Sequence, residues 1–159
     1  MFSLTKKQVK ALLDIMSSDD ARPVLAGVHI AEFKGKVCAI ATDSYILAAM
    51  PCELPLGEKS FVPRSSIERW HKLATAKSTL EKYELADMLE VSPSNAPNFE
   101  RVVPEEEQEQ KAVSFQARYM VALESLKTSP LVLSLRSSVG VGVDDTTDST
   151  YVIMPLRIK

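Results

Sequence analysis

The feature that most constrains this sequence is the repetition of one pattern: a short strand, an amphipathic helix and further strands. The first copy opens with an apolar stretch at residues 2–4. Apolar residues then recur at helical spacing between Val9 and Met16, behind Thr5 and Gln8 at the spacing of a capping box. Apolar stretches broken by turn residues follow between 22 and 54, and they predict three strands.

The same pattern returns twice. A strand that ends near Pro63 precedes a second helical pattern that ends near Leu73. A third helix, with Tyr119 and Leu123 on its apolar face, precedes another group of strands. These strands are predicted at 131–138, 139–145 and 150–159. Repetition of one unit indicates a pseudo-symmetric fold, so we predict the α+β class, with antiparallel sheets that carry helices on one face.

Two segments fall outside the repeated pattern. Residues 80–91 suit either a helix or an alternating strand, and we predict a strand for 80–85. Residues 92–99 have the composition of a loop, and the run PEEEQEQ at 104–110 is typical of an acidic linker. We therefore predict the one internal joint of the chain here.

Composition limits the classes of protein to consider. At 159 residues, with 45% hydrophobic and 25% charged residues, the chain has the size and balance of one globular domain. Its apolar runs are too short to cross a bilayer, and its N-terminus lacks the features of a signal peptide, so we expect a cytoplasmic protein. Cys38 and Cys52 lie in apolar sequence, which favours buried thiols over a disulfide. His29 and His71 have no Cys or carboxylate at ligand spacing, and we expect no metal and no other cofactor.

Candidate catalytic residues are few. The pairs Asp19-Asp20 and Asp144-Asp145 stand in polar, turn-like sequence without a partnered His or Lys, and we interpret them as turn residues. The sequence also lacks a Gly-rich phosphate loop, a nucleophile elbow and a Cys–His pair. We predict that the protein is not an enzyme.

Four stretches resemble, in the family's order, the bacterial sliding clamp, which is the beta subunit of DNA polymerase III. They are RPVLAGVHI with AIATDSYILAAM, FVPRSSIERWHKL, NAPNFERVVP, and the C-terminal part from SFQARYMVALESLK to YVIMPLRIK. By this resemblance residues 1–104 correspond to the middle domain of a clamp and 111–159 to the second half of its last domain. The first clamp domain and the first half of the last one have no counterpart, so the chain looks like a single, shortened clamp-like domain.

In the clamp family a pocket between the middle and last domains binds short linear peptides of polymerases and other replication proteins. The resemblance implies that the pocket lining here is Arg22, Leu25, Thr42, Ser44, Tyr45, Ile46, Leu47, Pro104, Val152, Met154, Pro155, Leu156 and Arg157. An apolar groove of such side chains can desolvate the Leu or Phe anchors of an extended peptide. After Ala-Thr-Asp the family commonly has Gly, an aromatic residue or His, and then Arg. This chain has Ser44, Tyr45 and Ile46 there, so a basic contact is lost.

The resemblance also implies that helices face double-stranded DNA and contact its phosphates without reading sequence. The predicted DNA-facing residues are Lys6, Lys7, Lys10, Arg69, Lys72 and Arg118. Asp14 and Glu68 dilute this basic character, and the formal net charge of the chain is −2. A solvated surface of mixed charge is the competing interpretation of any single Lys.

We predict a sliding-clamp-like processivity factor of DNA replication that binds peptides and encircles DNA as a homo-oligomer. The alternative is an interaction protein that captures clamp-binding peptides as a decoy or adaptor and never encircles DNA. The retained basic residues favour the ring, whereas the missing domains and the negative net charge favour the alternative.

Overall fold

A computed structural model describes residues 2–19, 21–103, 115–126, 132–136, 139–144 and 146–155. The helices are α1 (Lys6–Ile15), α2 (Arg64–Leu73), α3 (Lys82–Asp87) and α4 (Ala117–Leu126), with 3₁₀ turns η1 (Pro23–Leu25) and η2 (Phe99–Val102). The strands are β1 (Ser3–Thr5), β2 (Gly27–Phe33), β3 (Lys36–Thr42), β4 (Ile46–Pro51), β5 (Lys59–Pro63), β6 (Thr79–Glu81), β7 (Glu90–Val91), β8 (Leu133–Arg136), β9 (Val139–Asp144) and β10 (Ser149–Ile153).

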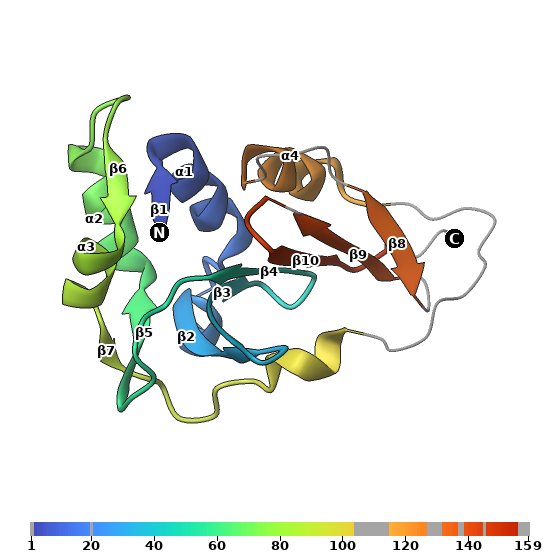
Figure 1. The fold of residues 1–159 in the computed structure, drawn as a ribbon, viewed down its shortest axis with the longest axis horizontal. Helices are drawn as coiled ribbons and strands as arrows, with labels where there is room; N and C mark the ends of the chain where they lie inside the picture. Colours follow the sequence, from blue (N-terminus) through green and yellow to red (C-terminus); the bar gives the residue numbers. More distant parts are fainter. Residues whose placement is uncertain are drawn as a thin grey trace.

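Within the described residues, one antiparallel sheet of eight strands organises the molecule (Figure 1). Its strand order is β7-β5-β2-β3-β4-β10-β9-β8, and β1 pairs with β6 in a separate two-stranded sheet. The pairing of β4 with β10 joins the N-terminal and C-terminal parts of the chain, with Leu47 opposite Val152 and Ile46 opposite Ile153. The large sheet is therefore continuous between two segments that lie about a hundred residues apart in the sequence.

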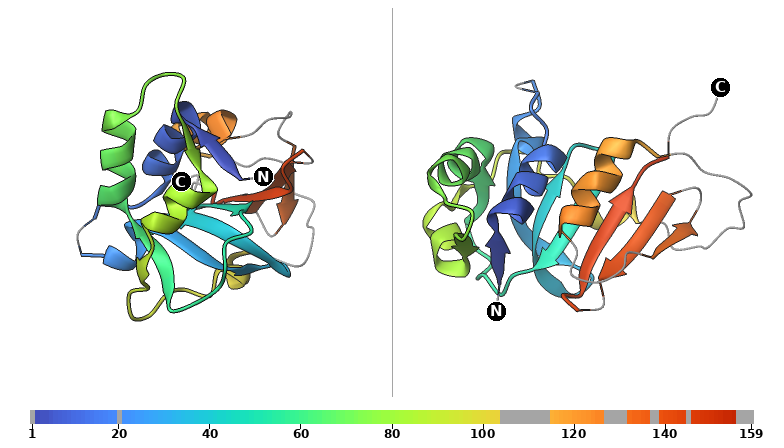
Figure 2. Two further views of the ribbon diagram at one scale, coloured as in Figure 1. Left: turned by 60° about the vertical axis from the view of Figure 1, so that its left-hand side comes forward. Right: turned by 90° about the horizontal axis from the view of Figure 1, so that it is seen from above.

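Helices α1, α2 and α4 lie on one face of this sheet, and η2 lies on the other (Figures 1 and 2). Successive strand side chains alternate between the two faces. Val28, Ile30 and Ile153 pack into the core under the helices, whereas Ile40 and Val152 pack on the η2 side with Phe99. The sheet thus has apolar residues on both faces, which explains why its strands are apolar runs rather than strictly alternating ones.

The helix ends are fixed by local and tertiary contacts. The Thr5 hydroxyl accepts a hydrogen bond from the Gln8 N–H at 3.3 Å, and the Gln8 Oε1 accepts one from the Thr5 N–H at 2.9 Å. At the other end of α1, the Arg64 Nη1 donates to the carbonyls of Leu13 at 2.6 Å and Met16 at 3.1 Å. Among the described helices, none is long and apolar enough to span a membrane.

The predicted fold class is confirmed: the sheets are antiparallel, and the helices cover one face of the large sheet. The predicted capping box is also present. The strand predicted for 80–85 is wrong beyond Glu81, because α3 begins at Lys82. Glu81 and Glu84 form a second capping box there, and it stabilises the helix start. The predicted acidic linker at 104–110 lies outside the described residues.

Candidate functional site

A small apolar hollow lies where the turn between β3 and β4 meets the end of β10. Its lining residues are Thr42, Ser44, Tyr45, Ile46, Leu47, Val102, Val152 and Met154. The β4–β10 pairing brings the two walls together, and the Met154 N–H extends it by donating to the Tyr45 carbonyl at 2.7 Å. Seven of the residues predicted for the peptide pocket are therefore neighbours around one hollow.

The turn that forms one wall of the apolar hollow is held by its own side chains. The Thr42 hydroxyl donates to the Ile46 carbonyl at 2.7 Å and accepts from the Ser44 N–H at 3.1 Å. The Asp43 Oδ1 accepts from the N–H groups of Tyr45 at 2.9 Å and Ile46 at 3.1 Å. Ser44 adopts a φ of 82°, which lets the chain reverse within these few residues.

The size of the apolar hollow limits what it can hold. Its cavity volume is about 10 Å³, which is about the room that one water molecule needs. Pockets that take a whole small molecule are larger, about 300–1,000 Å³. The apolar hollow is therefore shallow in this conformation, and an anchoring side chain can enter only if lining side chains such as Met154 move aside. Val102 was missed by the sequence prediction, which named Pro104 of the same Val-Val-Pro stretch.

Tyr45 separates the apolar hollow from a second, polar hollow. The polar hollow is lined by Leu13, Asp14, Met16, Ser17, Ser18, Asp19, Arg22, Asp43, Tyr45, Arg64 and Arg118. Arg22 lies here, with its Nε 3.1 Å from the Asp19 Oδ2. Hydrogen bonds from the Ala21 N–H and from Arg22 lower the pKa of the Asp19 carboxyl. Arg22 thus lines the same polar hollow as Tyr45 but lies outside the apolar hollow.

The remaining predicted pocket residues have other places. Leu25 is buried in η1, where its carbonyl accepts from the Ser17 N–H at 3.0 Å, and it does not line the apolar hollow. Pro155 follows Met154 and is half-buried. Pro104, Leu156 and Arg157 lie outside the described residues.

The predicted DNA-facing residues of α1 and α2 lie in the helix layer. Lys7, Lys10, Arg69 and Lys72 are exposed. Lys10 forms an ion pair with Asp14, one turn further along α1. The Lys6 Nζ donates to the Ala74 carbonyl at 2.5 Å and so ties α1 to the end of α2.

A groove between α1 and α2 contains Lys10, Leu13, Asp14, Arg64, Glu68, His71 and Lys72. Burial and the nearby Lys6 and Lys10 lower the pKa of His71. The positive charge of this groove therefore comes from its Lys and Arg side chains. Arg64 is also paired with Glu68, through an Nε–Oε1 contact of 2.8 Å.

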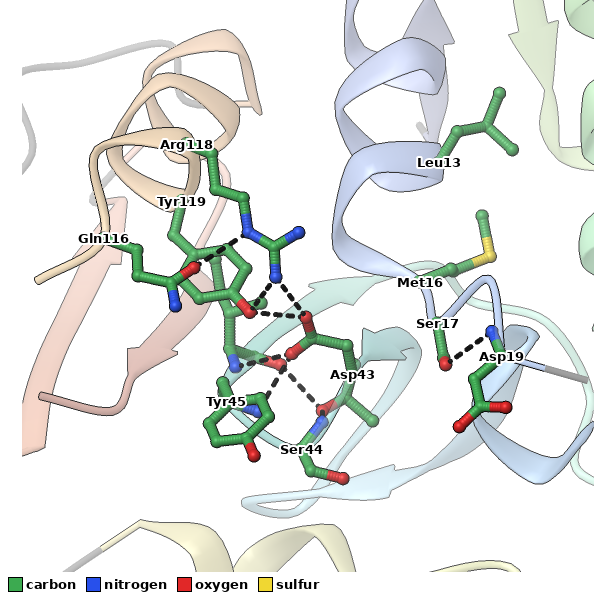
Figure 3. A network of polar contacts seen from close by, with 12 residues as sticks. Leu13, Met16, Ser17, Asp19, Asp43, Ser44, Tyr45, Gln116, Arg118 and Tyr119 are labelled. Carbon is green, nitrogen blue, oxygen red and sulfur yellow. Dashed lines mark hydrogen bonds and ion pairs between the residues drawn. The ribbon is translucent and has the colours of Figure 1, made fainter. Parts of the chain in front are cut away.

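The side chain of Arg118 has a different environment from the other predicted DNA-facing residues. Its Nη2 donates to the Tyr119 hydroxyl at 2.6 Å and lies 3.5 Å from the Asp43 Oδ2 (Figure 3). It therefore faces the β3–β4 turn. The neighbouring exposed residues of α4 include Met120 and Val121, which are apolar. Among the described residues, no three His, Cys, Asp or Glu side chains gather as a metal site.

Comparisons with known proteins give a result only at the level of structure. No protein-family model and no curated protein sequence matches the chain. Among solved structures, it is similar to the DnaN sliding clamp of Bartonella birtlesii bound to griselimycin, with a TM-score of 0.66 and 16% identity. It is also similar to DNA polymerase III subunit beta of Borrelia burgdorferi in complex with a natural product, with a TM-score of 0.65 and 12% identity. The sliding clamp of Bacillus subtilis gives a TM-score of 0.64 and 14% identity.

These matches extend over almost the whole chain but over only part of each clamp. They cover 99% of this chain, and they cover 66%, 64% and 64% of the three clamps in the order above. The fold is therefore that of the bacterial sliding clamps, and the chain spans just under two thirds of the clamps that it matches.

Proposed function

We propose that the chain is a clamp-like processivity factor of DNA replication that binds linear peptides of DNA polymerase and other replication proteins in the apolar hollow. In this proposal it acts in the cytoplasm, has no catalytic activity, and assembles into a homo-oligomer around double-stranded DNA. The observation that carries the proposal is the apolar hollow itself, which two distant parts of the chain form together within a sliding-clamp fold.

The chemistry of the apolar hollow favours a peptide anchor as its ligand. Leu47 and Val152 are buried and apolar, and Val102 packs beside them, so a Leu or Phe side chain that enters exchanges water for apolar contacts. The thioether of Met154, which is half-buried, can adapt its shape to different anchors. Thr42, Ser44 and Tyr45 also line the hollow, and they are its hydroxyl-bearing residues.

The proposed peptide site is tested by replacing Met154. A synthetic clamp-binding peptide with Leu and Phe anchors is labelled, and its affinity is measured by fluorescence anisotropy. Met154→Glu places a charge where the anchor has to desolvate, so we expect at least tenfold weaker binding, which corresponds to about 1.4 kcal/mol.

Met120→Glu is the matched control, because Met120 is a partly exposed methionine of α4 that does not line the apolar hollow. This variant should bind the peptide as the unmodified chain does. Equal affinity of the Met154→Glu variant and the unmodified chain would exclude the apolar hollow as the peptide site. No binding by the unmodified chain would contradict the proposed function as a whole.

A further inference from the structure

We propose that Tyr119 and Arg118 of α4 are positioning residues for the apolar hollow. They hold the Asp43 carboxylate, and through it they hold the β3–β4 turn that forms one wall of the hollow. The ligand in this inference rests on the proposed function, whereas the control of the turn by α4 can be tested without any ligand.

On the α4 side, two side chains reach the same carboxylate oxygen (Figure 3). The Tyr119 O–H donates to the Asp43 Oδ2 at 2.6 Å, and Tyr119 is only 2% exposed. The Arg118 Nη2 donates to the Tyr119 hydroxyl at 2.6 Å and forms an ion pair with the same Oδ2 at 3.5 Å. The Gln116 Oε1 accepts from the Arg118 Nε at 2.9 Å, which orients the guanidinium.

On the turn side, the other oxygen of Asp43 holds the backbone of the wall. Its Oδ1 accepts from the N–H groups of Tyr45 and Ile46, and both residues line the apolar hollow. The Tyr45 carbonyl in turn accepts from the Met154 N–H, on the opposite wall. A single carboxylate thus connects α4 to the turn, and the turn connects to the end of β10.

The position of Tyr119 makes it the cleaner of the two residues to test. It does not line the apolar hollow, so any effect of its hydroxyl on a ligand has to pass through Asp43. The Asp43 side chain is 12% exposed, and a charge-assisted hydrogen bond in such a place is stronger than one in water. The side chain of Arg118, in contrast, is 65% exposed, so its ion pair with Asp43 is a weak replacement for the hydrogen bond from Tyr119.

The test uses Tyr119→Phe, which removes only the hydroxyl. Amide hydrogen exchange of Tyr45 and Ile46, followed by NMR, reports whether Asp43 still protects these two N–H groups. We expect their exchange to become about tenfold faster, as loss of a hydrogen bond to a charged group would produce. The amide of Ile40, in the centre of the sheet, should change much less.

Tyr151→Phe is the matched control. Tyr151 is also a buried tyrosine, 1% exposed, and packs in the same core under the helices. Its hydroxyl makes no contact with the β3–β4 turn among the described hydrogen bonds. This variant should therefore leave unchanged the ratio of the exchange rates of Tyr45 and Ile46 to that of Ile40. Equal relative exchange in the two tyrosine variants would overturn the inference, because both would then act only through overall stability.

Peptide affinity of the same variants gives the second measurement. If the unmodified chain binds the peptide, Tyr119→Phe should weaken binding severalfold, and Tyr151→Phe should leave the affinity unchanged. Equal affinity of the unmodified and Tyr119→Phe proteins would overturn the inference. If the unmodified chain does not bind, the proposed function fails, and the exchange rates still decide whether α4 positions the turn.

Discussion

Ser44 shows how a single backbone conformation shapes the candidate site. Its φ of 82° is costly for a residue with a Cβ atom, by about 1–2 kcal/mol, and is allowed for glycine. The resemblance to sliding clamps places a glycine at this position in the family. Ser44 therefore keeps the shape of the turn with a residue that strains it.

Replacement of Ser44 by glycine should relieve this strain. The Ser44 N–H still donates to Thr42 in the variant, so the turn is retained. We expect the free energy of unfolding to rise by about 0.5–1 kcal/mol, since the added flexibility of glycine in the unfolded chain offsets part of the gain. Urea unfolding measures the change. Ser18→Gly is the control, because Ser18 is exposed and its φ is not positive. If Ser44→Gly lost as much stability as this control, the strain assigned to Ser44 would be contradicted.

Cys38 gives a prediction on pH at the same scale. Burial raises the pKa of its thiol from the ordinary 9.0 to about 11, and burial also raises the pKa of Cys52. Between pH 9 and pH 11 the unfolded chain loses the Cys38 proton while the folded chain keeps it, so the unfolded state binds fewer protons and stability falls as pH rises.

The expected result is a free energy of unfolding that declines above pH 9. Burial also raises the pKa of Tyr119, and it raises the pKa of Tyr151 to about 12. These two groups extend the decline in stability to higher pH. Urea unfolding at pH 7.5 to 10.5 measures the slope, and Cys38→Ala should make it shallower. Identical slopes in the two proteins would show that Cys38 does not keep its proton on folding.

At the scale of elements, the capping box of α1 is both a feature that the sequence revealed and a test of how the helix begins. Thr5→Ala removes the hydroxyl that accepts from the Gln8 N–H. We expect a loss of about 1 kcal/mol in the free energy of unfolding, which thermal or urea unfolding would detect. Thr146→Ala is the control at an exposed turn between β9 and β10. If both variants lost the same stability, the cap would have no special role.

Local pattern predicted most elements, and contacts between distant segments explain the failures. The helices around Val9, Ile67 and Leu123 were predictable because their apolar residues follow the helical period. The switch from β6 to α3 was not, since Leu80 is fixed as a strand residue by pairing with Leu4 of β1. The next residues satisfy both periods, and the capping box that Glu81 and Glu84 form favours the helix.

The candidate site, too, has a part that the sequence predicted and a part that it did not. Seven lining residues followed from the resemblance, because short motifs kept their order along the chain. The link from Tyr119 to Asp43 was not predictable, since it joins residues 76 positions apart and Tyr119 has the spacing of an ordinary core residue. The sequence around Asp43 is typical of a turn, which accounts for its Oδ1 but not for the Oδ2 that accepts from Tyr119.

The proposed function leads to a prediction of which helices contact DNA. In α1 and α2 the exposed basic residues include Lys7, Arg69 and Lys72. In α4 the exposed Arg118 is paired with Asp43, and Met120 and Val121 beside it are apolar. If α2 contacts phosphates, Lys72→Glu should weaken binding to a DNA duplex of any sequence. It should also reduce the slope of log affinity against log salt by about 1.

Arg101→Glu is the control for this measurement, because Arg101 is an exposed arginine of η2, on the other face of the sheet. Its replacement changes the net charge equally. An equal loss of DNA binding in the two variants would indicate attraction by overall charge instead of contact by the helix layer.

At the scale of the whole molecule, the eight-stranded sheet has two ends, β7 and β8. An unpaired strand edge is a template for pairing with another chain. A closed symmetric assembly repeats the same interface between its copies, so it has a fixed number of copies. The proposed ring therefore requires a discrete mass that is a whole multiple of the 17.5 kDa of one chain.

Light scattering over a concentration series should show this mass together with the single chain, in proportions that shift with concentration. The ring has a further topological consequence: a closed ring assembled on a circular plasmid stays on it at high salt, because no end is available for escape. Cutting the plasmid once should release the protein, whereas binding by charge alone would give the same retention on circular and linear DNA. A mass of 17.5 kDa at every concentration would contradict encirclement, because one chain of this size does not close around a duplex by itself. The capture of peptides without a ring would then be the function left to test in the apolar hollow.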